Sequence, residues 1–256
     1  MPERPPAGRS AHATKPAPKP TQSLRGKIAL ITGASRGIGL AISRALADHG
    51  CNLVITARSQ STLKKAGREL HGVRVLAQAC DVGDERSVDS LFDAIRKEFG
   101  RLDFLINNAG TAHALANVDK LSSKVWQEVI ATNLTGLFLC TRAALPLMSR
   151  GAAIVNNLSV AAKGVFAGES AYCASKHGGL GFTNTLREEV RGRGIRVIAL
   201  LPGPTDTEIW DQFMPDAPRS RMLRAETVAQ AVVDALILPP ESTVEEITLA
   251  PTSGSV

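Results

Sequence analysis

Short runs of apolar residues alternate along this chain with longer segments in which apolar residues recur every three or four positions. The short runs cover residues 28–32, 52–56, 73–76, 102–106, 153–155, 195–201 and 246–249. The longer segments cover residues 38–49, 88–99, 125–148, 171–191 and 225–238. Short apolar runs are typical of strands, and a spacing of three or four is typical of helices. The pattern therefore predicts strands and helices in turn.

Several of the predicted strands are almost continuously hydrophobic, which is typical of strands that are covered on both faces. Gly50, Gly100 and Gly194 stand where three of the predicted helices should end. Strands that alternate with helices form a parallel sheet joined by right-handed crossovers. We therefore predict an α/β fold, with a single doubly wound, Rossmann-type domain over residues 26–256. Its parallel sheet should have about seven strands, with helices on both faces.

The charge of the chain is unevenly distributed. The 256 residues carry a formal net charge of +6, which by itself suggests a nucleic acid or an anionic surface as partner. Residues 1–25, however, hold five basic residues and one acidic residue, together with six of the 14 prolines. Such a segment buries too little apolar surface to fold, so we predict a disordered, proline-rich basic tail and no nucleic-acid partner. A transit peptide is the alternative, although the prolines oppose an amphipathic helix.

Composition narrows the class of protein further. The sequence has no continuous apolar run of about 18 residues, so we predict no membrane span. The four cysteines lie far apart and form no paired motif, which predicts reduced thiols in a cytoplasmic protein. No cluster of histidine, cysteine and carboxylate residues has the spacing of metal ligands, so we predict no metal.

A glycine-rich loop joins the first predicted strand to the first predicted helix. In doubly wound sheets ligands bind beyond the carboxyl ends of the strands, and glycines there let a pyrophosphate approach the helix N-terminus. A tight turn without a ligand is the alternative interpretation of three glycines. The placement favours dinucleotide binding by Gly33, Ser35, Arg36, Gly37, Ile38 and Gly39.

The end of the second predicted strand indicates which dinucleotide is preferred. A carboxylate here usually binds the ribose of NAD, whereas this chain has Arg58, with Arg36 in the preceding loop. Two guanidinium groups can hold a 2′-phosphate, which favours NADP(H), although two solvated arginines are the simpler alternative. Asp81 and Val82 follow the third strand and should lie beside the adenine.

A candidate catalytic group lies in the second half of the chain. Tyr172, the single tyrosine, and Lys176 are four residues apart in a predicted helix and therefore share one face. A neighbouring ammonium favours the phenolate, so we expect Lys176 to lower the pKa of Tyr172. Ser159 follows the fifth strand and could bond a substrate oxygen. These three residues suit proton transfer to an alkoxide that forms at a carbonyl carbon. The alternative for the tyrosine and lysine alone is a half-buried ring beside a solvated amine, without a catalytic role.

Together the motifs resemble the short-chain dehydrogenase/reductase superfamily, from about Gly26 to Leu249. They are Thr32-Gly-Ala-Ser-Arg-Gly-Ile-Gly39, Asn107-Asn-Ala-Gly110, Asn133, Ser159, Tyr172-Cys-Ala-Ser-Lys176 and Pro202-Gly203. The resemblance implies that Asn133 completes a catalytic tetrad by holding a water that Lys176 uses as a proton relay. It also implies that the cofactor is contacted by Asn108, Ala109, Gly110, Tyr172, Lys176, Pro202, Gly203 and Thr205. Within the family, Arg58 resembles the NADP-preferring members.

The sequence therefore predicts an NADP(H)-dependent oxidoreductase that interconverts a ketone and a secondary alcohol. The alternatives are a catalytically silent NADP-binding sensor or scaffold and, within the enzyme class, a 3-oxoacyl-acyl-carrier-protein reductase. The chain resembles those reductases in its glycine loop and active-site helix, but it lacks their basic cluster and has only Arg150 before the fifth strand.

The predicted partner is a small carbonyl or alcohol substrate. The stretch 206–224 should form the wall of its site, with the apolar Trp210, Phe213, Met214 and Met222 and with Arg219, Arg221 and Arg224. These arginines could meet an anionic substrate or be solvated. His113 and His177 flank candidate site residues, and we expect a hydrogen-bonding or solvated role for both. By resemblance, the segments 125–148 and 171–191 should form a homo-oligomer, a dimer or a tetramer.

Overall fold

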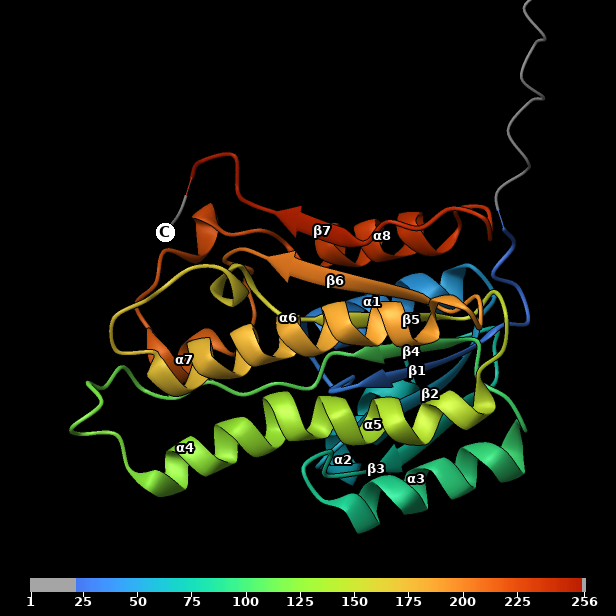
Figure 1. The fold of residues 1–256 in the computed structure, drawn as a ribbon, viewed down its shortest axis with the longest axis horizontal. Coiled ribbons are helices and arrows are strands. Elements are labelled where there is room, and N and C mark those ends of the chain that lie inside the picture. Colours follow the sequence, from blue (N-terminus) through green and yellow to red (C-terminus); the bar gives the residue numbers. More distant parts are fainter. Residues whose placement is uncertain (1–21, 255–256) are drawn as a thin grey trace, which may run out of the picture.

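The computed structural model describes residues 22–254. Its sheet has seven strands, all parallel, in the order β3-β2-β1-β4-β5-β6-β7 (Figure 1). They are β1 (Ile28–Thr32), β2 (Asn52–Ala57), β3 (Val75–Ala79), β4 (Phe104–Asn107), β5 (Ala153–Asn157), β6 (Arg196–Pro202) and β7 (Glu246–Leu249). The predicted fold class is therefore confirmed.

Helices cover both faces of this sheet, because each buries one apolar side against the strands. One face carries α1 (Gly37–Asp48), α2 (Gln60–Gly67) and α8 (Ala225–Leu236). The other carries α3 (Glu85–Glu98), α5 (Gly136–Ala144) and α6 (Ser170–Arg191). The helix α4 (Ser123–Ile130) leads into α5, and the short α7 (Trp210–Phe213) lies in the loop after β6.

The short helix α7 was not predicted, and the structure differs from the predicted elements in three larger respects. The helix α2 was not predicted, because among its eight residues only Leu63 and Ala66 are buried, which leaves a weak apolar pattern. The predicted strand 73–76 lies at Val75–Ala79, where it pairs with β2. The predicted helix 125–148 is interrupted by a π-helical turn at Ala131–Thr135 and ends in a 3-10 turn at Leu145–Leu147.

The order of the strands in the sheet determines where a ligand-binding crevice can open. The chain builds β1, β2 and β3 outward in one direction and then returns to add β4 on the other side of β1. The loops after β1 and β4 therefore leave the sheet in opposite directions and open a crevice between them. The residues singled out in the sequence follow the carboxyl ends of β1 to β6 and so converge at this edge of the sheet.

The segment from Ser123 to Leu147 is long and apolar enough to span a membrane by length and mean hydropathy alone. The sequence did not indicate such a segment, because its apolar residues are not continuous but are distributed over α4, the π-helical turn and α5. In the structure α5 packs against α3, and the turn packs against α6. A core helix of a soluble fold passes the same test, so the segment is weak evidence for a membrane.

The last residues of the predicted tail pack against the folded domain. Residues 1–21 lie outside the described residues, and the tail was expected to run to residue 25. Leu24, however, is only 2% exposed and belongs to the core on the α1 side. Its carbonyl accepts a hydrogen bond from the Cys51 thiol, and the Gln22 amide donates to Ile237 O at 2.7 Å. The folded domain therefore begins before Gly26, because Leu24 fills a place in its core.

We expect Leu24→Ala to lower the free energy of unfolding by about 2–5 kcal/mol, because the change leaves a cavity in the core. The exposed neighbour Ser23 serves as a control, since Ser23→Ala should change that free energy by no more than about 0.5 kcal/mol. Urea unfolding of both variants measures the difference. Equal stability of the two would show that Leu24 does not belong to the core.

Candidate active site

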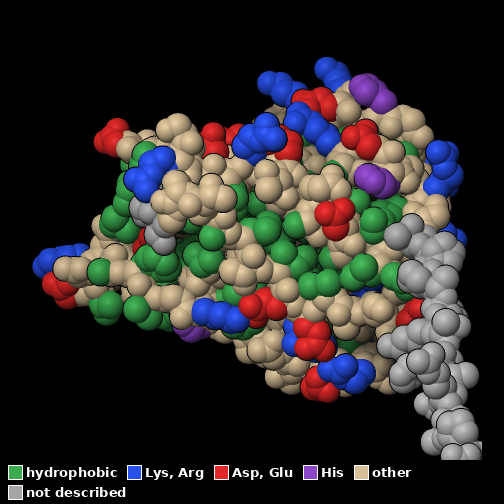
Figure 2. All heavy atoms as spheres, turned by 90° about the horizontal axis from the view of Figure 1, so that it is seen from above, with side chains coloured by type: hydrophobic (Ala, Val, Ile, Leu, Met, Phe, Trp, Pro, Cys, Tyr) green, Lys and Arg blue, Asp and Glu red, His purple; other side chains and the backbone are tan. Residues whose placement is uncertain are grey.

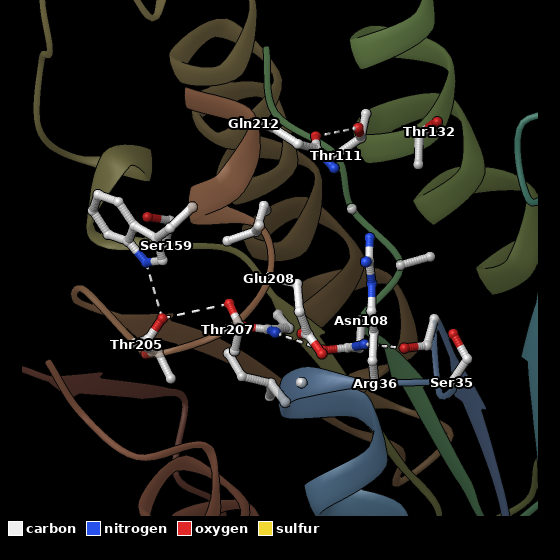
Figure 3. A pocket seen from close by; sticks show the side chains of 18 of the residues that line it. Ser35, Arg36, Asn108, Thr111, Thr132, Ser159, Thr205, Thr207, Glu208 and Gln212 are labelled. Carbon is white, nitrogen blue, oxygen red and sulfur yellow. Dashed lines mark hydrogen bonds between the residues drawn. The ribbon is translucent and has the colours of Figure 1, made fainter. Parts of the chain in front are cut away.

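A cavity of about 760 Å³ opens at the carboxyl ends of the strands. It is lined by most of the predicted site residues: Gly33, Ser35, Arg36, Gly37, Ile38, Arg58, Asp81, Val82, Asn108, Ala109, Gly110, Ser159, Tyr172, Lys176, Pro202, Gly203 and Thr205. Figure 3 shows Ser35 and Arg36 on one side of this space and Ser159 on the other. Of the residues predicted to be catalytic or to bind the cofactor, only Gly39 and Asn133 are absent from the lining. The volume suits a dinucleotide together with a small substrate.

The glycine loop requires its glycines because the backbone packs against its neighbours. Gly33 has a φ of 65°, and a Cβ atom there would lie 2.8 Å from the Cα of Ala109. A Cβ atom on Gly39 would lie 2.4 Å from both Asn108 Nδ2 and Gly33 O. Gly39 is therefore a packing residue beneath the loop, and it lets α1 begin directly against the strand ends. The free amides of the α1 N-terminus thus face the cavity, where they can bind an anion.

Hydrogen bonds between side chains and backbone join the ends of β1, β4 and β5. Asn108 donates from Nδ2 to Thr32 O at 2.9 Å, and its backbone amide donates to Thr32 Oγ1 at 2.9 Å. The Asn108 Oδ1 atom accepts from Asn157 Nδ2 at 2.8 Å. Asn157, which the sequence analysis did not single out, also offers its carbonyl to Lys176 Nζ at 3.2 Å. These bonds fix the floor of the cavity.

Asn133 lies beneath the cavity, inside the π-helical turn, and is only 3% exposed. Its Oδ1 atom accepts from the Thr111 amide at 2.8 Å, and its Nδ2 atom donates to Thr111 O at 2.9 Å. Nδ2 also lies 3.0 Å from Ser175 Oγ. The side chain therefore holds the loop after β4 against α6, close to Lys176.

Tyr172 and Lys176 project from one face of α6, as predicted. Lys176 is 5% exposed, and its Nζ atom lies 5.4 Å from the centre of the Tyr172 ring. Burial lowers the pKa of Lys176 to about 8. Burial also raises the pKa of Tyr172 to about 12, although its hydrogen bond with Ser159 opposes that rise.

The expected lowering of the Tyr172 pKa by Lys176 is therefore not what the structure shows. The same burial penalises both the phenolate and the ammonium, so it raises the pKa of Tyr172 and lowers the pKa of Lys176. The carboxylate of Glu169 raises the phenol pKa further. As a result Tyr172 keeps its proton at neutral pH, in the state of a proton donor.

Three cationic side chains line the end of the cavity near the glycine loop. Arg36 and Arg58 are both exposed there, and Lys65 of α2 joins them. The nearby Glu69 is paired with Arg44, whose Nε lies 3.0 Å from its carboxylate. Asp81 and Val82 complete this end. The donor set suits a phosphorylated ribose, so these residues fit NADP.

The loop after β6 forms the outer wall, as expected, with Trp210 and Met214 lining the cavity. Trp210 Nε1 donates to Thr205 O at 2.9 Å. Met222 is buried away from the cavity, and the side chain of Phe213 lies outside the described part of the structure. Of the three arginines, none lines the cavity. Arg219, for example, binds Asp206 at 3.1 Å and Asp211 at 2.6 Å within the loop itself.

Sequence reasoning missed several residues that line the cavity. They include Lys65, Thr111 and Glu169, and also Thr207, Glu208 and Gln212, which lie in the predicted wall 206–224 but were not named individually. Thr207 lies next to Gly37, and Gln212 accepts hydrogen bonds from Thr111 Oγ1 at 3.2 Å and from the Ala112 amide at 3.3 Å. Most of these residues stand in irregular loops, where no periodic pattern indicates which way a side chain points. Within residues 22–254, no three histidine, cysteine or acidic residues are grouped to hold a metal.

Comparison with known proteins adds independent information. The family model described as short chain dehydrogenase matches residues 27–218. D-threitol dehydrogenase of Mycolicibacterium smegmatis is 39% identical over 223 residues, which cover 82% of this chain and 85% of that protein. The 3-oxoacyl-acyl-carrier-protein reductase of Vibrio cholerae is 34% identical, with 86% of this chain and 93% of that protein covered.

A solved structure agrees in fold. The alcohol dehydrogenase from the archaeon Thermococcus sibiricus, complexed with 5-hydroxy-NADP, superimposes with a TM-score of 0.83 at 32% identity. The match covers 89% of this chain and 97% of that one. The family predicted from the motifs is confirmed: this chain belongs to the short-chain dehydrogenase family.

Proposed function

We propose that this protein is an NADP(H)-dependent oxidoreductase that interconverts a ketone and a secondary alcohol. The observation that carries the proposal is the hydrogen-bonded pair of Ser159 and Tyr172, with the buried Lys176 behind it, on the wall of a cavity that has a phosphate-binding end. The family and the alcohol dehydrogenase structure complexed with 5-hydroxy-NADP support the same class and cofactor.

The chain's own residues divide the work of proton transfer. A bound nicotinamide supplies or takes up the hydride. Ser159 holds the carbonyl oxygen by a hydrogen bond, and Tyr172 donates its proton to that oxygen as the alkoxide forms. Lys176, whose Nζ lies 5.4 Å from the centre of the Tyr172 ring and donates to Asn157 O, is the group that would replace this proton. Asn133 holds the loop at Thr111 in place by two hydrogen bonds and so supports proton transfer between Lys176 and Tyr172.

The preference for NADP(H) rests on the cations at the glycine-loop end. Arg36 and Arg58 approach the cavity from two different loops, and Lys65 lies on the adjoining helix. No acidic residue follows β2 directly to repel a phosphate, since the sequence there is Arg58-Ser59. A guanidinium pair can hold a phosphate in two-point contacts, which a single solvated amine cannot match.

We also propose that the protein is a cytoplasmic homo-oligomer. All four cysteines are free thiols, which suits a reducing compartment. Trp126 and Phe138 are 41% and 42% exposed on the segment predicted to form an interface. Figure 2 shows a second apolar area, gathered at the centre of the face seen from above, with charged side chains around it. Burial of such apolar surface favours association.

A catalytically silent NADP-binding scaffold is the alternative from another class. Against it stands the arrangement of Ser159, Tyr172 and Lys176, because a protein that only binds the cofactor needs no buried proton donor. A reductase of acyl-carrier-protein substrates has less support, because the residues before β5 offer Arg150 as their only basic side chain.

We expect Tyr172→Phe to reduce turnover by about 10²–10⁴-fold, because the variant lacks the proton donor. NADPH oxidation with a panel of ketones measures this, and NADPH fluorescence checks that cofactor binding is retained. Equal turnover by the variant and the wild type would overturn the mechanism. Tight NADPH binding by a wild type that reduces no ketone would favour the silent scaffold.

Arg58→Asp should weaken NADPH binding at least about tenfold, because it removes a charged hydrogen-bond donor and adds repulsion. NADH binding should change far less. Arg68→Asp is the matched control, because Arg68 lies at the end of α2 and outside the cavity. Titration of both cofactors into each variant gives the comparison, and a preference for NADPH that survives Arg58→Asp would exclude Arg58 as the selector.

Stability should depend on pH through Lys176. Its pKa is about 8 in the folded chain and near its ordinary value of 10.5 when unfolded, so between these values the unfolded chain binds the extra proton. Stability therefore rises with pH in this interval. The wild type should gain about 3 kcal/mol relative to Lys176→Met from pH 8 to pH 10.5. Urea unfolding across this range measures the gain, and a constant difference would contradict the low pKa.

A further inference from the structure

The charged side chains that line the cavity are unevenly placed along it. Near the glycine loop lie the cations Arg36, Arg58 and Lys65 together with the acids Glu69, Asp81 and Glu208, of which Glu69 is paired with Arg44 and Glu208 lies beside Gly37; Lys176 lies behind Tyr172. The opposite end, which we call the substrate end, is formed by lining residues 159–172 together with 209–214 and Thr111. Among the described residues of the substrate end, Glu169 is the only charged side chain. A carboxylate therefore sets the electrostatics where the substrate must lie.

The position of Glu169 is fixed by its backbone. It immediately precedes α6, and its carbonyl accepts a hydrogen bond from the Cys173 amide at 2.8 Å. Its amide donates to Phe166 O at 3.2 Å, and the residue pairs with Ala116 in a short parallel bridge. Its side chain caps no backbone amide of α6. The carboxylate is thus held three residues from Tyr172 without the structural role that an acidic residue at this place usually has.

A histidine lies behind the carboxylate. His113 is 7% exposed, and its Nδ1 lies 2.8 Å from Ala114 O, which only accepts, so Nδ1 carries a hydrogen. Its Nε2 is buried and has no hydrogen-bond partner among the described residues. Burial raises the pKa of Glu169, and the nearby His113 opposes that rise. A buried imidazole nitrogen without a hydrogen-bond partner and a half-buried carboxylate both cost folding free energy, so their presence side by side needs an explanation.

We propose that Glu169, supported by His113, determines the substrate class of the enzyme. The carboxylate accepts a hydrogen bond from a hydroxyl group close to the reacting carbonyl, and it repels anions. The substrates are then uncharged hydroxylated ketones and the polyols that their reduction yields. This inference rests on the proposed function and names the substrate class of the same site.

The arginines of the outer wall do not offset this carboxylate. Arg219 is engaged by Asp206, Asp211 and the Thr207 carbonyl at 2.7 Å. Arg221 donates to Ser253 O at 3.3 Å, away from the cavity. The substrate end therefore presents hydrogen-bonding groups and one negative charge, which suits several hydroxyl groups better than a carboxylate or phosphate.

Three ketones of nearly equal size test the proposal. Hydroxyacetone and butanone carry a CH2OH and a CH2CH3 group on the carbonyl carbon, and pyruvate carries a carboxylate there. With NADPH, the wild type should have a higher kcat/KM for hydroxyacetone than for butanone, and the lowest for pyruvate. In Glu169→Gln, the ratio of hydroxyacetone to butanone should fall about tenfold, because the amide is a weaker acceptor. This ratio of kcat/KM values is insensitive to any effect of the substitution on Tyr172 as proton donor, because both ketones use the same proton donor.

Glu189→Gln provides the matched control, because Glu189 is exposed further along the same helix and should leave the ratio unchanged. Glu169→Lys provides a second, independent variant. It should raise the kcat/KM for pyruvate relative to butanone at least about tenfold, by replacing repulsion with attraction. NADPH titration confirms that each variant is folded and binds the cofactor.

Two results would overturn the inference: a wild type that prefers pyruvate to hydroxyacetone, or a Glu169→Gln variant whose ratio equals that of the wild type. Failure of the proposed function would look different, because the wild type would then reduce none of the three ketones or a wider ketone panel.

Discussion

The site depends on hydrogen bonds that the strand ends cannot make with one another. Beyond the last ladder pair of a parallel sheet the backbone groups have no partners, and buried groups without partners are costly. Asn108 supplies the missing partners by bonding to Thr32 and Gly33 on one side and to Asn157 on the other. The ends of β1, β4 and β5 are therefore held at fixed spacing while their loops diverge. The crevice between those loops has a rigid floor.

That floor places the other parts of the site. Gly39 has no side chain because Asn108 occupies the space, so α1 starts directly at the cavity. Asn157 both holds Asn108 and receives the ammonium of Lys176, which links the strand ends to the catalytic helix. Burial in this packing keeps Tyr172 protonated and makes Lys176 easier to deprotonate, which suits both groups for passing a proton.

Apart from Lys176, the cations that line the cavity all lie near the glycine loop, together with Glu69, Asp81 and Glu208. Arg36, Arg58 and Lys65 come from the loops and helix near β1 and β2, where a phosphate can be neutralised. Glu169 stands at the other end, where the wall otherwise consists of neutral side chains. The arginines can thus hold a phosphate at the first end, whereas the second end offers a carboxylate and no cation of its own. The proton-transfer residues lie between the two ends.

The sequence by itself determined the fold class, the order of the strands along the chain and the candidate catalytic and cofactor-binding residues, most of which line the cavity. These features depend on local signals: apolar periodicity, glycines at strand ends, and the spacing of Tyr172 and Lys176 on one helical turn. Tertiary structure alone decided the pKa values, because burial is a property of the packed chain; the predicted lowering of the Tyr172 pKa was wrong for this reason.

Tertiary structure also decided which loop residues meet. Glu169 and His113 are 56 positions apart and come together only because the two loops pair at Ala116. Leu24 entered the core although its neighbours in the chain predicted a tail. In each case the contact partner lies far away in the sequence, and a periodic pattern carries information only about neighbours on the same element.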